Sequence, residues 1–229
     1  MTFTLLLTCT CKVQDNITWL KERNLEKRIK TYVKKIKKWI KNTNIDIVVI
    51  ENSGFNFNEL QKYVCDRFEI ITFDYSKIDK NDNTLLKSMR SKGQHEIYSI
   101  NYAYKRSKII KKNNYLFKLT GRYFLPNFEK IINEFNYTQY SYIIQHDSDH
   151  VSKNKYKGKL IDKIGFPKRC ELVGCKKELI DKFFKFPLKN DHMEQELYER
   201  LHDLSILVLP KIYLDEKTKQ GCGHEMIYI

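Results

Sequence analysis

Strand-like and helix-like segments alternate regularly through the first half of the chain. Apolar runs that suit strands occupy residues 2–10, 45–50 and 68–74. Between them, residues 24–41 carry apolar side chains at helical spacing, and residues 58–66 suit a shorter helix. Repeats of this kind form parallel sheets through right-handed crossovers. The order therefore predicts an α/β fold with a Rossmann-like, mostly parallel central sheet flanked by helices.

The bulk properties of the chain fit one folded domain with an anionic partner. Its 229 residues suffice for one substantial core, and no internal repeat or low-complexity linker divides them. The net charge of +14 favours a nucleotide, a nucleic acid or an acidic membrane surface as partner. The lysine-rich side of residues 24–41 is either a solvated helix surface or a docking face for an anionic membrane.

The cysteines and the apolar segments indicate a cytoplasmic protein. The six cysteines are scattered and match no zinc-binding spacing, so we expect reduced thiols in a reducing compartment. The apolar start of the chain lacks a basic region and a cleavage site, and we interpret it as a strand and not as a signal peptide. No apolar segment approaches the roughly 20 residues that span a bilayer.

Polar side chains follow several of the predicted strands. Because the carboxyl ends of parallel strands meet at one edge of the sheet, where ligands bind in such folds, these side chains are candidate binding residues. Lys118 and Arg122, around the turn that ends a strand at residues 115–120, can meet an anion, and Gly121 lets a ligand approach the backbone. Ordinary strand ends with solvated charges are the alternative. The full candidate set is Thr8, Thr10, Glu51, Asn52, Lys92, Gly93, Glu96, Lys118, Thr120, Gly121 and Arg122.

Acidic residues in the second half are candidates for metal binding or proton transfer. Asp147 and Asp149, flanked by histidines, can ligate a hard divalent cation or can form an Asp-rich turn. Glu194 stands three residues after Asp191, so it also suits the capping box of a helix. The glycine-containing tail at residues 221–226 is flexible by composition, and His224 can fold back onto a site.

In its order of segments the chain resembles GT-A-type glycosyltransferases, which use nucleotide-sugar donors. The resemblance covers residues 2 to about 213. It matches Thr8-Cys9-Thr10 to the segment beside the nucleobase and Glu51-Asn52-Ser53 to the segment facing the nucleoside. It matches residues 92–96 to the helix start that contacts nucleotide and pyrophosphate. The resemblance thus implies one domain, with a nucleotide-sugar-binding half at 1–125 and an acceptor-side half at 126–229.

One departure from that family concerns the Asp-x-Asp motif, which binds a divalent cation. Here Lys118-Leu119-Thr120-Gly121-Arg122 occupies its position. Either Lys118 and Arg122 neutralise the departing diphosphate directly, or Asp147 and Asp149, with His224, hold Mn²⁺ or Mg²⁺.

The resemblance also implies catalytic roles and partners. It places Glu194 first as the base that deprotonates the acceptor hydroxyl, with Asp147 or Asp191 behind it and Arg122 as an exposed, charge-stabilising residue. The donor would be a nucleotide sugar and the acceptor a glycan or polypeptide, as in viral or microbial glycan biosynthesis.

Two other classes compete with this interpretation. A basic nucleic-acid-binding or nucleic-acid-processing protein would suit the charge and the aromatic content. However, the lysines are spread along the whole chain, and no recognised nucleic-acid-binding motif occurs. A Rossmann-like methyltransferase would need a glycine-rich first loop, and residues 8–16 contain no glycine.

Overall fold

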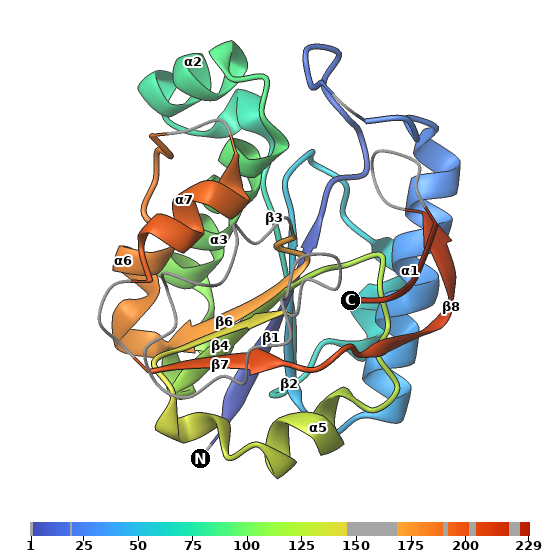
Figure 1. The fold of residues 1–229 in the computed structure, drawn as a ribbon. Coiled ribbons are helices and arrows are strands. Elements are labelled where there is room, and N and C mark those ends of the chain that lie inside the picture. Colours follow the sequence, from blue (N-terminus) through green and yellow to red (C-terminus); the bar gives the residue numbers. More distant parts are fainter. Residues whose placement is uncertain (1, 19, 146–168, 190–191, 202–204, 220–224) are drawn as a thin grey trace.

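A seven-stranded sheet forms the centre of the computed structural model of the chain, which describes all residues except 1, 19, 146–168, 190–191, 202–204 and 220–224 (Figure 1). Its strand order is β3-β2-β1-β4-β6-β5-β7. The strands are β1 (Phe3–Cys9), β2 (Asp46–Glu51), β3 (Phe68–Thr72), β4 (Tyr115–Thr120), β5 (Tyr142–Gln145), β6 (Leu172–Lys176) and β7 (Ile206–Leu209). The first four strands pair in parallel, and β5 pairs with β7 in parallel, whereas β6 runs antiparallel to both β4 and β5.

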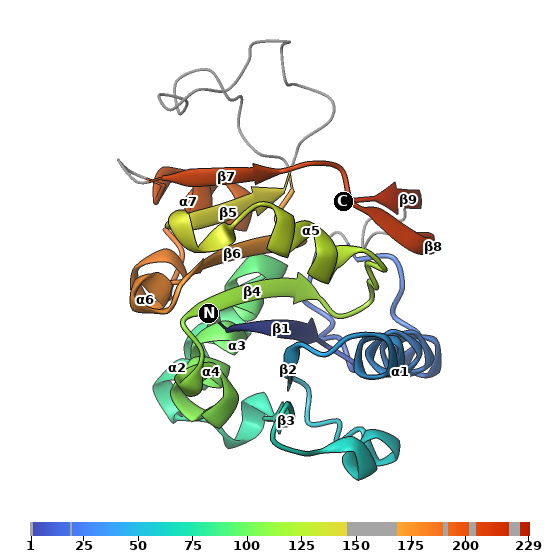
Figure 2. The same ribbon diagram turned by 90° about the horizontal axis from the view of Figure 1, so that it is seen from below.

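Helices cover both faces of the sheet (Figure 2). The α-helices are α1 (Leu25–Asn42), α2 (Lys80–Ser88), α3 (Lys92–Arg106), α4 (Lys108–Lys112), α5 (Phe128–Glu134), α6 (Ile180–Phe183) and α7 (Met193–Glu199). The 3₁₀ segments are η1 (Asn58–Tyr63), η2 (Tyr75–Lys77), η3 (Tyr137–Gln139) and η4 (Lys177–Leu179). Helices α1 and α5 lie on one face, and α3, α4, α6 and α7 lie on the other.

The alternation of side chains along β1 explains why both faces are covered. Leu5 and Leu7 join the core that packs against α1, while Leu6 joins the core that packs against α3. Because every residue of β1 is buried, this strand needs an apolar layer on each side. The α/β prediction with a mostly parallel sheet is therefore confirmed.

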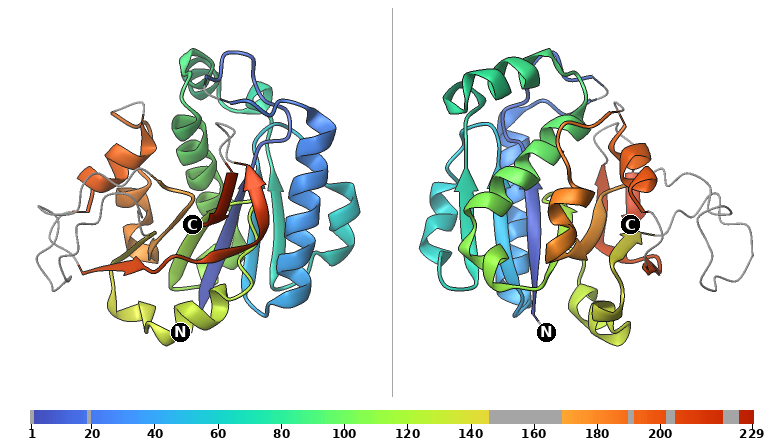
Figure 3. Two further views of the ribbon diagram at one scale, coloured as in Figure 1. Left: turned by 45° about the vertical axis from the view of Figure 1, so that its right-hand side comes forward. Right: turned by 90° about the vertical axis from the view of Figure 1, so that its left-hand side faces the viewer.

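Helix α1 lies against the sheet through its apolar side and carries a small hairpin on its lysine side. Asn24 caps the helix by accepting a hydrogen bond from the backbone N–H of Lys27 at 2.9 Å. Strand β8 (Tyr213–Lys219) pairs with β9 (Glu225–Tyr228) in a separate antiparallel sheet beside α1 (Figure 3). On β8, Asp215 and Glu216 each lie 2.6 Å from the buried Nζ of Lys35.

This hairpin corrects two expectations from the sequence. The predicted solvated or membrane-docking lysine face is partly covered, since Lys34 and Lys38 also pair with the acidic residues of β8. The part of the tail from residue 225 to 228 forms β9, although its composition indicated flexibility.

The predicted helix at 58–66 is a 3₁₀ segment, η1. Among the described residues, no helix is both long and apolar enough to cross a membrane.

Candidate functional site

A polar cavity of about 560 Å³ lies at the carboxyl edge of the parallel strands. Its walls come from the ends of β1, β2 and β4, the N-terminal parts of α1, α3 and α7, and the loops at residues 10–18, 20, 90–91 and 170–171. Parallel neighbours bring the three strand ends together, since Thr8 pairs with Ile50 on one side and with Thr120 on the other. The reversed direction of β6 brings Cys170 and Glu171, which precede it, to the same edge.

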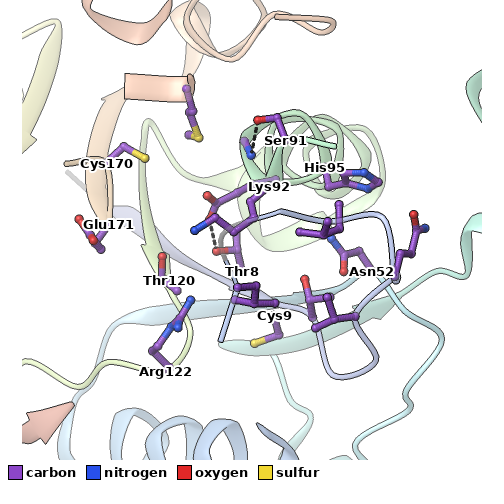
Figure 4. Close-up of a pocket in the computed structure, with 18 of the residues that line it drawn as sticks. Thr8, Cys9, Asn52, Ser91, Lys92, His95, Thr120, Arg122, Cys170 and Glu171 are labelled. Atoms are coloured by element: carbon purple, nitrogen blue, oxygen red, sulfur yellow. Dashed lines mark hydrogen bonds between the residues drawn. The ribbon is translucent and has the colours of Figure 1, made fainter. Parts of the chain in front are cut away.

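Most of the predicted binding residues line this cavity (Figure 4). They are Thr8, Thr10, Asn52, Lys92, Gly93, Glu96, Thr120 and Arg122, and the predicted base Glu194 lines the cavity as well. They come from segments far apart in the sequence, and the predicted meeting of strand ends at one edge accounts for their convergence.

Arg122, in the turn after β4, is one of the cations that line the cavity. The side chain is half-buried and not exposed as predicted, and its Nε is buried without a hydrogen-bond partner among the described residues. Burial disfavours the charged form, but the neighbouring Tyr123, Tyr32 and acidic groups outweigh this effect and raise the pKa of Arg122. A guanidinium that lines a cavity and forms no ion pair with the described residues is available to an anionic ligand.

Lys118 does not reach the cavity, which corrects the prediction that it meets an anion there. Its side chain is fully buried in the middle of β4, where Nζ lies 2.8 Å from Oε1 of Glu96 and donates a 2.7 Å hydrogen bond to the carbonyl of Cys170. Burial disfavours the charged form of Lys118, but Glu96 and the other nearby acidic groups together outweigh this effect and raise the pKa of Lys118. Thr8 donates a 2.5 Å hydrogen bond to the same Oε1. This network ties α3 to β1 and β4.

Two further predicted binding residues have structural roles behind the cavity wall. The fully buried carboxylate of Glu51 accepts hydrogen bonds from the backbone N–H groups of Cys11, Ser53 and Phe55 and from the Ser53 hydroxyl. Gly121 allows the ends of β4 and β1 to approach, because an added Cβ would lie 2.5 Å from Sγ of Cys9. Neither residue lines the cavity.

The start of α3 supplies a cationic wall. Ser91 caps this helix by accepting a hydrogen bond from the backbone N–H of Gly93 at 3.2 Å. Arg90 and Lys92 flank the cap, and both line the cavity. Gly93 also packs against α7, since an added Cβ would lie 2.8 Å from Cβ of Met193. The positive end of the helix dipole thus adds to two cationic side chains at this wall.

Glu194, the predicted base, lines the cavity, but the N-cap of its helix is not Asp191 as predicted. Helix α7 begins at Met193, and the residue at its N-cap position is His192. The Glu194 carboxylate accepts a 3.3 Å hydrogen bond from Sγ of Cys170. Burial is the main cause that raises the pKa of Cys170 well above its usual range, with Glu194 next, so this thiol stays protonated and is not a nucleophile.

Sequence reasoning missed several lining residues, among them Lys12, Arg28, Tyr32 and His95. Arg28 closes the loop after β1, because its Nε donates a 2.8 Å hydrogen bond to the carbonyl of Thr10. The helical spacing could have predicted the burial of Arg28 and Tyr32, because both lie on the same side of α1 as its apolar residues. Burial lowers the pKa of His95 and outweighs the hydrogen bond that Nε2 donates to the carbonyl of Met89.

The described residues do not form the ligand set of a divalent cation. Nowhere among them do three or more histidine, cysteine, aspartate or glutamate residues gather in such a cluster. The end of β4 and the turn after it, which occupy the position of the family's Asp-x-Asp motif, contribute Thr120 and Arg122 to the cavity. Asp147, Asp149, Asp191 and His224 lie outside the described residues.

The comparisons with known proteins identify the fold. The chain matches S. aureus TarS 1–349 with a TM-score of 0.55 and 11% identity, covering 91% of this chain and 58% of that one, which is less than two thirds. It also matches a protein from Desulfovibrio desulfuricans G20, described as a nucleotide-diphospho-sugar transferase, with a TM-score of 0.50 and 13% identity, covering 92% of this chain and 80% of that one. Neither a protein-family model nor a curated protein sequence matches the chain. At these identities the likeness shows the fold alone, which is a single α/β domain of the GT-A-like type.

Proposed function

We propose that the chain is a glycosyltransferase that moves a sugar from a nucleotide-sugar donor to a hydroxyl group of a glycan or polypeptide acceptor. The observation that carries this proposal is Arg122, which lines a polar cavity at the carboxyl edge of the sheet and whose Nε has no hydrogen-bond partner among the described residues. Open α/β folds bind nucleotides at this edge. The D. desulfuricans neighbour, described as a nucleotide-diphospho-sugar transferase, has the same fold.

The cations of the cavity would stabilise the leaving nucleoside diphosphate. Arg122 would make a two-pronged contact to phosphate oxygens, and Lys92 at the start of α3 would add a second positive charge. These two side chains are the charge-stabilising groups that the described residues supply, whereas Asp147, Asp149 and His224, the proposed ligands of Mn²⁺ or Mg²⁺, lie outside the described residues. Lys118 would act from behind the wall, as the partner that keeps Glu96 in place.

Glu194 would act as the base towards the acceptor. Its carboxylate takes the proton of the acceptor hydroxyl while the hydroxyl oxygen forms a bond to C1 of the donor sugar. The bond between C1 and the phosphate oxygen breaks, and its electron pair leaves with the nucleoside diphosphate. Attack opposite the leaving group would invert the anomeric configuration.

The test is a thermal-shift screen of the chain against UDP-, GDP- and CMP-sugars, each with Mn²⁺ and with a chelator. We expect saturable stabilisation by one nucleotide class, because a ligand that binds only the folded state raises its stability. Stabilisation in the chelator would support the role of the side chains, and a strict need for Mn²⁺ would contradict it. If no nucleotide sugar stabilises the chain while DNA or RNA binds with a steep salt dependence, the nucleic-acid alternative is correct.

Matched variants then test the two roles. Glu194→Gln keeps the size of the side chain but removes the base, so we expect donor binding to persist and transfer to fall by roughly 10²–10⁴-fold. Glu199→Gln, on the same helix but outside the cavity lining, is its control and should transfer normally. Normal transfer by Glu194→Gln would remove this residue from the mechanism.

A further inference from the structure

The Glu96 carboxylate is an acidic group fixed at the wall of a cavity whose lining also contains Glu171, Glu194 and several cationic side chains. Oε1 accepts the hydrogen bond of Thr8 and pairs with Lys118. Oε2 has no hydrogen-bond or ion-pair partner among the described residues. The side chain is 21% exposed and lines the cavity, so this oxygen is available to a ligand.

The charge of Glu96 determines which part of a ligand it can meet. A carboxylate only accepts hydrogen bonds, and it repels phosphate oxygens. Within the segment 92–96, which was predicted to contact nucleotide and pyrophosphate, Glu96 is therefore better suited to the nucleoside or sugar part of a donor than to its phosphates. A hydroxyl group is the neutral donor that a nucleotide sugar offers in abundance, on its ribose and on its transferred sugar.

The surroundings of Glu96 hold the carboxylate in a fixed position. The buried Lys118 and the Thr8 hydroxyl approach the same oxygen from β4 and β1, while Glu96 itself belongs to α3. Three elements of the core thus fix the direction in which Oε2 accepts. Prior fixation of a binding group lowers the entropy lost when the ligand binds.

We propose that Glu96 is a specificity-determining residue whose Oε2 binds a hydroxyl group of the nucleotide-sugar donor, with Lys118 as the positioning residue behind it. This inference rests on the proposed function. It divides the cavity by chemistry: Arg122 and Lys92 take the diphosphate, and Glu96 takes a polyhydroxyl part of the same ligand.

The experiment combines changes in the protein with changes in the ligand. Glu96→Leu/Lys118→Met removes both charges together, so neither is left buried alone. Glu96→Gln/Lys118→Met is the matched control that keeps a neutral acceptor. The probes are UDP and GDP with their 2′,3′-dideoxy forms, and UDP-glucose and GDP-mannose, measured by calorimetric titration.

A ribose contact predicts that the natural chain binds the ribonucleotide about tenfold more tightly than its dideoxy form. Glu96→Leu/Lys118→Met should reduce this ratio to within about twofold, and the glutamine control should retain an intermediate ratio. A contact to the transferred sugar predicts instead that the variant loses the gain of the nucleotide sugar over its nucleoside diphosphate. Either result supports the inference.

Two other results would contradict the inference or the proposed function. If both preferences survive in Glu96→Leu/Lys118→Met, Glu96 does not bind a hydroxyl and the inference is wrong, while the proposed function stands. If the natural chain binds none of the probes and none of the nucleotide sugars of the thermal-shift screen, the proposed function itself fails and the inference falls with it. Thr8→Val is a second variant in case the double change prevents folding. It preserves the ion pair between Glu96 and Lys118 but removes the hydrogen bond that holds Oε1 of Glu96. The preference for the hydroxyl-bearing ligand should therefore fall by about threefold.

Discussion

The replacement Lys118→Met tests the buried network most sharply. The change removes the ion pair to Glu96 at 2.8 Å and the 2.7 Å hydrogen bond to the carbonyl of Cys170, and it leaves the carboxylate without its cation. Removing one partner of a buried pair costs about 3–5 kcal/mol. Because the Glu96 side chain is 21% exposed, water can reach it, and we expect a loss near the lower limit, about 3 kcal/mol. For a domain of this size, that corresponds to a fall in Tm of about 6–12 °C.

The assay is urea denaturation followed by circular dichroism. Lys130→Met is the control, because Lys130 is highly exposed, pairs with Glu134 at 3.8 Å and should leave the free energy of unfolding unchanged. Glu96→Leu/Lys118→Met should recover at least half of the loss, since no charge remains unpaired. A loss of less than about 1 kcal/mol for Lys118→Met, or a double variant less stable than the single one, would refute the reasoning.

Three further predictions concern packing and pH. Gly121→Ala should lower the free energy of unfolding by about 1–3 kcal/mol in chemical denaturation, since its Cβ would meet Sγ of Cys9 at 2.5 Å; unchanged stability would contradict this contact. Hydrogen bonds from two lysines of α1 lower the pKa of Glu216 from its ordinary 4.5 to about 2, so its contribution to stability is present above pH 4.5 and is lost as the pH falls towards 2. The variant Glu216→Gln should lack this part of the acid dependence, and an identical pH profile would exclude it. Burial lowers the pKa of His95, so the neutral imidazole stabilises the fold above its ordinary pKa of 6.5, and this stability declines as the pH falls below that value. His95→Gln should therefore flatten the decline of Tm between pH 7 and pH 5 in thermal melts. An unchanged slope would show that His95 does not cause the decline.

The part of the fold that is repetitive along the chain could be predicted from the sequence. The alternation of β1, α1 and β2 fixes a parallel arrangement, because an apolar strand, an amphipathic helix and another apolar strand have few other ways to bury their surfaces. The same reasoning brings Thr8, Asn52 and Thr120 to one edge, where the structure places them.

The direction of β6 could not be predicted in this way. A strand buried on both faces has the same apolar pattern whether its neighbours run parallel or antiparallel to it. Cys170 was therefore not expected at the cavity, although the reversed strand brings it there.

The ion-pair partners of individual charged side chains could not be predicted from the sequence either. Lys118 alternates with apolar residues along β4, but its partner Glu96 comes from α3 and meets it only in the folded chain. Lys35 looked like part of a solvated helix face until the structure placed the acidic residues of β8 against it. Charge pairs between distant segments leave no periodic signal that a single sequence reveals.

The most direct test of the central claim is the affinity of the cavity for a diphosphate in the natural chain and in Arg122→Met. Titration calorimetry would compare UDP and GDP with the nucleosides uridine and guanosine, in the presence of a chelator. The account predicts that Arg122→Met weakens binding of the diphosphate by at least about tenfold and leaves binding of the nucleoside unchanged. Equal affinity of both proteins for the diphosphate would contradict the assignment of Arg122 and, with it, the proposed donor site.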